Sequence, residues 1–252
     1  MRFASLGSGS AGNGLVVEVA RTRVMLDCGF GLNDAVNRLA RLGLQPDDLT
    51  GIVVTHEHAD HIGGAGRFAR KFKLPVWLTA GTLSMAQDLD HVDVHVIDSH
   101  TLFAVQDMAV QPFPVPHDAR EPVQFVFSDG AKRLGVLTDV GCSTAHIEAM
   151  LAGMDALILE CNHDRAMLEQ GAYPPKLKQR VGGRFGHLEN SQSAELLGKL
   201  KHEKLQCVMA AHISRKNNTP SLARRALAQV LNCADNEVRV ACQFAGFDWI
   251  NL

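Results

Sequence analysis

Residues 55–61 read Thr-His-Glu-His-Ala-Asp-His, and this string limits what the chain can be more than any other feature of its sequence. It places three imidazoles and one carboxylate within six residues, directly after a short apolar run that predicts a buried strand. Zinc and similar divalent metals bind imidazole nitrogen and carboxylate oxygen. On a loop, His56 and His58 can turn towards one ion, and Asp60 and His61 towards a second. The string therefore predicts a centre that binds two metal ions.

The length and composition of the chain suit one folded unit, which we expect to span residues 1–252. Hydrophobic residues make up 46% of the chain, enough for a sizeable core. No apolar run of about eighteen residues is present to cross a bilayer, and the first residues lack the pattern of a secretory signal. We therefore expect a cytoplasmic protein without a membrane partner. The six cysteines contain no Cys-x-x-Cys pair and are expected to be free.

Alternating and apolar runs predict an α/β chain whose order of elements does not suit a regular βαβ barrel. Strands are predicted at 2–6, 14–20, 23–27, 51–55, 75–79, 94–97, 108–115, 123–128, 133–138, 155–161, 205–211 and 237–244. Helices are predicted at 33–42, 62–72, 143–152, 163–170, 190–201 and 219–232. Asn33 or Asp34 is expected to cap the first helix, and Thr219 followed by Pro220 the last. Residues 171–186, with two prolines and four basic residues, are expected to form a long loop.

The His-x-His-x-Asp-His string resembles the hallmark of the metallo-β-lactamase superfamily, and the resemblance extends over most of the chain. It implies an αβ/βα four-layer sandwich, in which two mixed sheets are flanked by helices. It also implies that the two ions are each held by three residues: His56, His58 and His117 for one; Asp60, His61 and His212 for the other. Asp139 would bridge both ions. Because each ligand follows a strand-like run, we expect all seven to converge on one sheet edge.

Asp139 narrows the resemblance to one branch of the superfamily. Members that hydrolyse β-lactams usually carry cysteine at this position, although Cys142 lies near enough for a shifted register. Three further strings are similar to the YycJ/WalJ-type phosphodiesterases or 5′-exonucleases: Asn162-His163-Asp164, Gly186-His187-Leu188 and His212-Ile213-Ser214-x-x-Asn217-Asn218. The opening Gly7-Ser-Gly-Ser-Ala-Gly-Asn13 resembles that of phosphodiesterase and RNase Z-like members, although a plain Gly-Ser turn explains it as well.

The resemblance implies hydrolysis of a phosphodiester by a metal-activated hydroxide. The residues expected to take part in catalysis are Asp60, His187 and His163, with one of the two histidines protonating the leaving group. Asp27, at the end of a predicted strand, is expected to orient a ligand histidine from outside the centre; a turn cap is its alternative role. Five residues are candidates for binding phosphate oxygens or a base: Ser10, Asn13, Arg184, Asn217 and Asn218. The donors suit zinc, with manganese or iron as alternatives.

Charge favours a nucleic-acid substrate. The chain carries a net charge of −2, yet the segment 164–225 holds twelve Lys/Arg against five Asp/Glu. Such a segment attracts phosphates, although a solvated face is the simpler explanation. We therefore expect a 5′-exonuclease-like enzyme acting on DNA or RNA. The alternatives are a cyclic phosphodiesterase, a thioester or lactone hydrolase of the glyoxalase II type, and a non-enzymatic metal-binding regulator. The oligomeric state stays open, a homodimer being one option.

Overall fold

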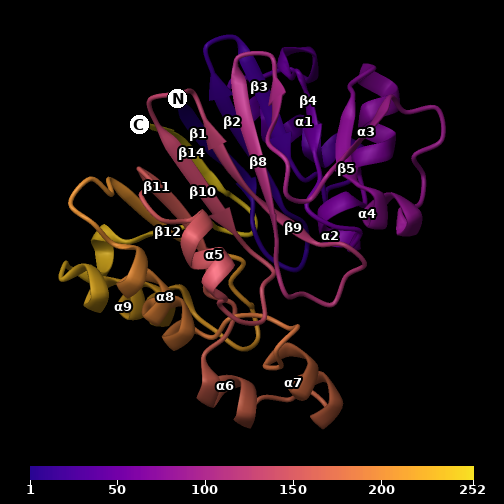
Figure 1. The fold of residues 1–252 in the computed structure, drawn as a ribbon. Coiled ribbons are helices and arrows are strands. Elements are labelled where there is room, and N and C mark those ends of the chain that lie inside the picture. Colours follow the sequence, from indigo (N-terminus) through magenta and orange to yellow (C-terminus); the bar gives the residue numbers. More distant parts are fainter.

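The computed structural model describes residues 1–252, in which two seven-stranded mixed sheets pack face to face (Figure 1). The first sheet has the order β14-β1-β2-β3-β4-β5-β6, with strands at Phe247–Asn251, Arg2–Gly7, Gly14–Val19, Thr22–Leu26, Gly51–Val53, Val76–Thr79 and Val94–Ile97. The second has the order β13-β12-β11-β10-β9-β8-β7, with strands at Arg239–Val240, Cys207–Ala211, Ala156–Glu160, Arg133–Leu137, Val123–Ser128, Met108–Pro114 and Phe103–Val105.

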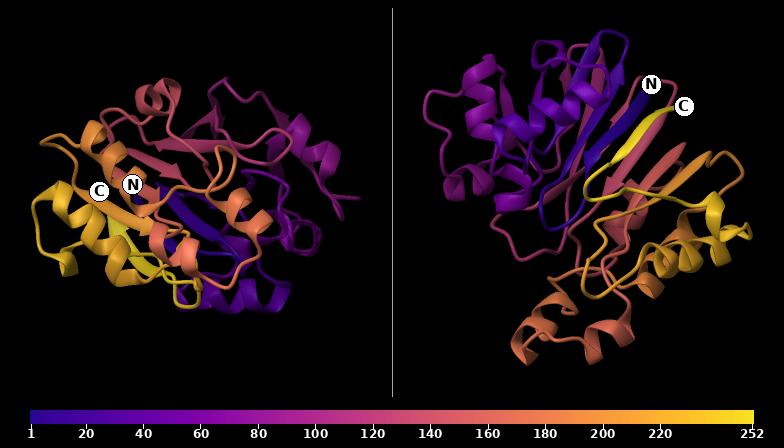
Figure 2. Two further views of the ribbon diagram at one scale, coloured as in Figure 1. Left: turned by 90° about the horizontal axis from the view of Figure 1, so that it is seen from below. Right: turned by 180° about the vertical axis from the view of Figure 1, so that it is seen from behind.

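Helices cover the outer face of each sheet, as the two further views make plain (Figure 2). Along the first half of the chain they are α1 (Leu32–Arg41), α2 (Ala59–Ile62), α3 (Ala65–Phe72) and α4 (Ala80–Met85). Along the second half they are α5 (Ala145–Met150), α8 (Asn190–Leu200) and α9 (Pro220–Leu231), whereas α6 (Arg165–Gln170) and α7 (Pro175–Val181) lie beyond the strand ends. The four-layer sandwich implied by the sequence is thereby confirmed.

Three groups of buried apolar side chains hold the four layers together. The central group fills the space between the sheets, where Phe3 of the first sheet and Phe125 of the second are both fully buried. A second group joins the first sheet to α1 and α3, and a third joins the second sheet to α8 and α9. Because both sheets are covered on both faces, their central strands are continuous apolar runs rather than alternating ones.

Most of the strands that precede the candidate ligands lie in a parallel part of each sheet; β8, which precedes His117, pairs antiparallel with its neighbours. The parallel strands are β3 to β6 in the first sheet and β10 to β13 in the second. Carboxyl ends of parallel strands meet at one sheet edge, so the loops after β3 and β4 face those after β10, β11 and β12. The expectation of a single sheet edge was wrong: the residues converge from the edges of two sheets.

Several predicted boundaries also need correction. The first helix begins after Gly31, so neither Asn33 nor Asp34 caps it. The centre of the predicted loop 171–186 forms α7, whose first residue is proline, a position that suits its fixed φ. The predicted strand 237–244 is only the two-residue β13, and the last five-residue strand, β14, pairs with β1 instead. Helix α4 and strand β7 were not predicted. Thr219 does cap α9, with its hydroxyl accepting from the Leu222 amide.

All six cysteines are free. None of the helices combines the length and apolar character needed to span a membrane.

Candidate metal centre

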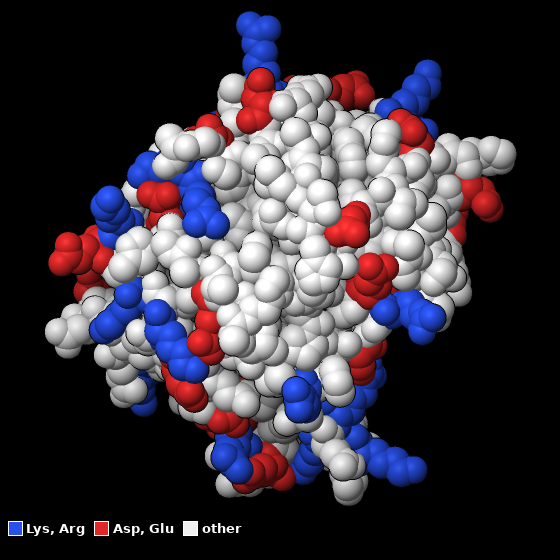
Figure 3. Space-filling view, viewed as in Figure 1, with Lys and Arg blue, Asp and Glu red and all other residues white.

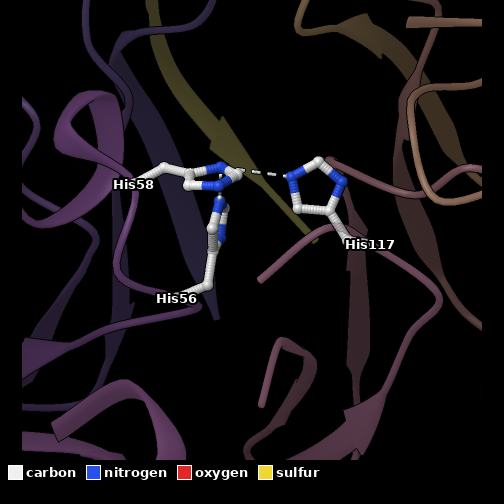
Figure 4. A group of neighbouring side chains, drawn as sticks. All are labelled: His56, His58 and His117. Carbon is white, nitrogen blue, oxygen red and sulfur yellow. Dashed lines mark hydrogen bonds between the residues drawn. The ribbon is translucent and has the colours of Figure 1, made fainter. Parts of the chain in front are cut away.

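Three histidine nitrogens meet where the loop after β4 faces the loop after β8. The Nε2 atom of His56 lies 2.9 Å from Nδ1 of His58, and Nε2 of His117 lies 3.3 Å from the same atom. Figure 4 shows the three rings turned towards one another. A neutral imidazole has one N–H group and one nitrogen lone pair, so three ring nitrogens pointing at one place cannot all form hydrogen bonds with one another. A metal cation at that place can accept the lone pairs of all three nitrogens.

The second ring nitrogen of two candidate ligands fixes which nitrogen is free to bind a metal. His117 Nδ1 donates to the Gly186 carbonyl at 3.0 Å, and His61 Nδ1 donates to the Asp27 carboxylate at 2.7 Å. In a neutral imidazole the other nitrogen then carries a lone pair and no proton. Each Nε2 is therefore aimed at the centre as an acceptor, and Asp27 lies where a carboxylate orients a ligand histidine.

A second group of donors lies beside the first, and the Asp139 carboxylate lies close to a member of each group. Asp60, His61 and His212 place one potential ligand atom each within 4.8 Å of one another, and Asp139 is grouped in the same way with His56 and His61. The buried atoms Asp139 Oδ2 and His212 Nε2 have no hydrogen-bond partner. Orphaned buried donors of this kind fit a divalent cation. Cys142 belongs to none of the groups, so the shifted register is not supported.

Glu160, at the end of β11, is a site residue that the sequence reasoning left out of the candidate set. Its fully buried carboxylate accepts from His187 Nδ1 at 2.8 Å and from the amides of Asp139, Val140 and Leu188. It also lies 3.2 Å from His212 Nδ1. Glu160 therefore ties together the loops that follow three different strands. A glutamate ending a wholly apolar strand was the available signal, because such a charge needs several partners.

In the second group, interactions between carboxylates and imidazoles determine the direction of the pKa shifts. Burial opposes protonation of His212, yet Asp139, Asp60 and Glu160 raise the pKa of this ring to about 10. Burial likewise opposes ionisation of Asp139, but His212 and His61 hold its pKa well below the usual value. The buried carboxylates are thus stabilised by positive charge at the centre. A divalent ion can supply this charge in place of the protons on the histidines.

The first group differs from the second in its charge. Burial holds the pKa of His56 well below that of a free imidazole, and burial also lowers the pKa of His117. Both rings are therefore neutral near pH 7, which is the protonation state that a metal ligand requires.

The backbone at three of these positions adopts a conformation that is uncommon outside glycine. Asp27, Asp139 and His212 have φ angles of 60°, 51° and 52°, and each follows directly on or shortly after the end of a strand. Left-handed backbone at residues other than glycine is rare and gathers at functional sites. Here the turn redirects each side chain from the strand towards the centre.

A cavity of about 310 Å³ opens onto the candidate ligands. His58, Asp60, Asp139 and His212 line one side, and Leu177, Arg180 and Val181 of α7 line another. These three residues of α7 share one helix face because they are three and four positions apart. Arg180 forms an ion pair with Asp118 at this wall. Arg180 was not predicted as a site residue, because residues 171–186 were expected to form a loop.

The two candidate proton donors occupy different places. His187 lines the metal-side cavity, and its side chain is 20% exposed. Burial opposes its protonation, but Glu160 raises the pKa of His187 above that of a free imidazole. His163 instead lines a neighbouring cavity together with Lys178 and Gln179, on the other face of α7. The arrangement favours His187 for chemistry at the metals.

The five expected substrate-binding residues are also dispersed. Ser10 is exposed and lines the metal-side cavity. Asn13 is buried, and its amide nitrogen lies 3.0 Å from His61 Nε2, so it contacts the ligands. Arg184 is exposed but is not part of the cavity wall. Asn217 and Asn218 are buried and are not part of the metal-side cavity wall. The Asn218 amide donates to the Cys161 carbonyl, and Asn218 lines a separate cavity.

Figure 3 shows Lys and Arg side chains at the lower end of the molecule, over α6 and α7, with acidic side chains among them. These two helices project from the body beyond the strand ends (Figure 1). The basic segment identified in the sequence therefore borders the metal-side cavity in part, through α7.

Comparison with known proteins identifies relatives along nearly the whole chain. A family model described as the β-lactamase superfamily domain matches residues 22–213. Exodeoxyribonuclease YycJ of Bacillus anthracis is 33% identical over 240 residues, which cover 92% of this chain and 89% of the relative. Exodeoxyribonuclease WalJ of Streptococcus pneumoniae D39 is 29% identical over 245 residues, covering 95% and 91%. The crystal structure of the metallo-β-lactamase fold protein YhfI from Bacillus subtilis shares the fold, with a TM-score of 0.78 at 15% identity over 99% of this chain and 98% of that one.

Proposed function

Because this chain belongs to the β-lactamase superfamily, we propose that it is a metal-dependent phosphodiester hydrolase that degrades DNA from an end. The observation that carries the proposal is the cavity in which Arg180 lies opposite two donor groups, with Asp139 close to a member of each. A guanidinium opposite a cationic centre suits a phosphodiester, which carries its negative charge on two oxygens. The names of the relatives YycJ and WalJ support DNA over RNA.

The donor set implies two ions within one domain of residues 1–252. Asp139 would lie between them, and each ion would have three further ligands: His56, His58 and His117 for one; Asp60, His61 and His212 for the other. Divalent ions at these positions would supply water activation near neutral pH and neutralise charge on the phosphoryl group. Zinc suits the donors best among the metals considered, and manganese and iron also bind such sets.

Side chains of the protein bind the substrate and move its proton. Arg180 binds a phosphate oxygen with the guanidinium nitrogens that Asp118 leaves free, since a guanidinium has five N–H donors. His187, oriented through Nδ1 by Glu160, presents Nε2 as the donor that protonates the leaving sugar oxygen. Asp27 and Glu160 keep His61 and His212 in the tautomers that face the ions.

The proposal is tested with single- and double-stranded oligonucleotides labelled at the 5′ or the 3′ end, incubated with manganese or zinc. We expect DNA to be shortened from one end, with labelled mononucleotide released early from a 5′ label. RNA of the same sequence and a thioester substrate serve as comparisons. Hydrolysis of the thioester with intact DNA would contradict the proposal.

Arg180 gives a prediction that separates substrate binding from metal binding. The Arg180→Ala variant should raise KM for DNA about tenfold or more, because a charge-assisted hydrogen bond to phosphate is lost. Its metal content should not change, since Arg180 is not among the donors. Arg184→Ala removes the same charge from an exposed position outside the cavity wall and is the matched control. If both variants raise KM equally, general charge rather than a specific contact explains the effect.

A further inference from the structure

Phe244 is a large apolar side chain held in an exposed position. Its side chain is 60% exposed, although it lies on the loop between β13 and β14 rather than at a chain end. The guanidinium of Arg215, three residues after the candidate ligand His212, lies over the ring at 5.1 Å from its centre. Exposing such a ring forgoes the stabilisation that its burial would bring.

The loop that carries this ring is held by hydrogen bonds from α1. Arg38 of α1 donates to the carbonyls of Gln243 and Phe244, at 3.3 and 2.9 Å. Arg41 of α1 donates to the carbonyl of Ala245. Two arginines of one helix thus bond three successive carbonyls of the loop. The ring is therefore presented by an ordered backbone, which lowers the entropic cost of binding a partner.

A cavity of about 310 Å³ lies against the ring, lined by Phe244 and Arg215 together with Ile213, Ser214 and Pro220. This volume falls in the usual range for ligand pockets. Ser8 also lines it, whereas Ser10 lines the metal-side cavity. The turn from Ser8 to Ser10 therefore stands between the two cavities, and the Ser8 hydroxyl accepts from the His212 amide at 2.9 Å.

We propose that this second cavity binds the base of a nucleotide next to the one whose phosphate lies at the metals, by stacking against Phe244 and Arg215. This inference rests on the proposed nuclease function. A planar ring beside a planar guanidinium is the combination on which nucleobases of single strands stack. The position supports a substrate strand over a protein partner, because one short turn separates the cavity from the candidate ligands.

Stacking does not depend on which base is present, and the two carboxamides beside the cavity are already engaged within the protein. The Gln243 side chain already accepts from the Ala11 amide and donates to the Gly12 carbonyl. The Asn218 amide is bonded within the protein to Cys161 and Asn190. Neither carboxamide is free to read a base edge. The subsite should therefore detect whether a base is present and tolerate any sequence, as stacking platforms do.

The experiment compares wild type and Phe244→Ala on two single strands: an intact oligonucleotide, and one made abasic near the end that is attacked. For the intact strand, the Phe244→Ala variant should raise KM about 5- to 150-fold, the range that corresponds to loss of one stacked base. For the abasic strand the two proteins should have the same KM. Leu102→Ala is the matched control. Leu102 is 57% exposed and precedes β7, which lies at the other edge of the second sheet from β13.

A Phe244→Trp variant gives a readout that does not depend on hydrolysis. It should retain the wild-type KM, and in the presence of a chelator the intact strand should quench its fluorescence while the abasic strand does not. Degradation of intact DNA with the same KM in wild type and Phe244→Ala, or an equal loss on both strands, overturns the base subsite and leaves the nuclease proposal standing. If wild type degrades neither strand, the nuclease proposal fails, and the subsite fails with it.

Discussion

The Asp139→Asn variant is expected to lose about a thousandfold or more of its hydrolytic rate. Loss of several kcal/mol of charge stabilisation in the transition state corresponds to a rate change of this size. Asparagine keeps the shape of the side chain but removes the negative charge, and Asp139 is the donor that lies between the two ligand groups. The variant should consequently retain less than the wild-type complement of metal.

Metal content by mass spectrometry and kcat/KM on DNA, measured on the same preparation, check this prediction. Asp93→Asn is the matched control. The Asp93 carboxylate is 72% exposed, and Asp93 belongs to none of the donor groups. A chelator should abolish the wild-type activity, and added manganese or zinc should restore it. A variant that keeps both ions and more than a tenth of the rate would show that Asp139 does not bridge them. Thermal unfolding of each variant distinguishes loss of metal from loss of fold.

The His187→Ala variant is expected to lower kcat on DNA about 10²- to 10⁴-fold, the usual contribution of a general acid. The leaving group of DNA is a sugar alkoxide, which needs a proton. The p-nitrophenyl ester of thymidine monophosphate has a leaving group that departs without one. The loss should therefore be much smaller on the ester, and KM should change little on either substrate.

His163→Gln is the comparison for this prediction, because His163 lines the neighbouring cavity on the other face of α7. It should retain most of the activity on both substrates. Equal losses on DNA and on the nitrophenyl ester in the His187 variant would exclude proton donation and indicate a positioning role. A large loss of kcat on DNA in the His163 variant alone would identify His163 as the proton donor instead.

Short-range patterns predicted most of the strands and helices, whereas the four-layer sandwich was implied by the family resemblance. Strand positions such as Val94–Ile97 and Val123–Ser128 were predicted with their observed bounds, because buried strands give continuous or alternating apolar runs. Residues 171–186 were misjudged because the prolines outweighed the helix signal, although Pro175 is a favourable first residue. Strand β14 was not predicted, since its partner β1 lies at the other end of the chain.

The His-x-His-x-Asp-His string by itself determined that the chain should have a metal centre, because ligand chemistry resides in residue type and close spacing. His117, Asp139 and His212 were identified through resemblance, and the structure brings them beside the string. Only the tertiary structure placed Glu160 beneath three loops, separated His187 from His163, and set Arg180 and Phe244 beside the cavities. The physical reason is that these positions depend on the packing of two sheets and a projecting helix. Contacts between residues tens to hundreds of positions apart leave no trace in local periodicity.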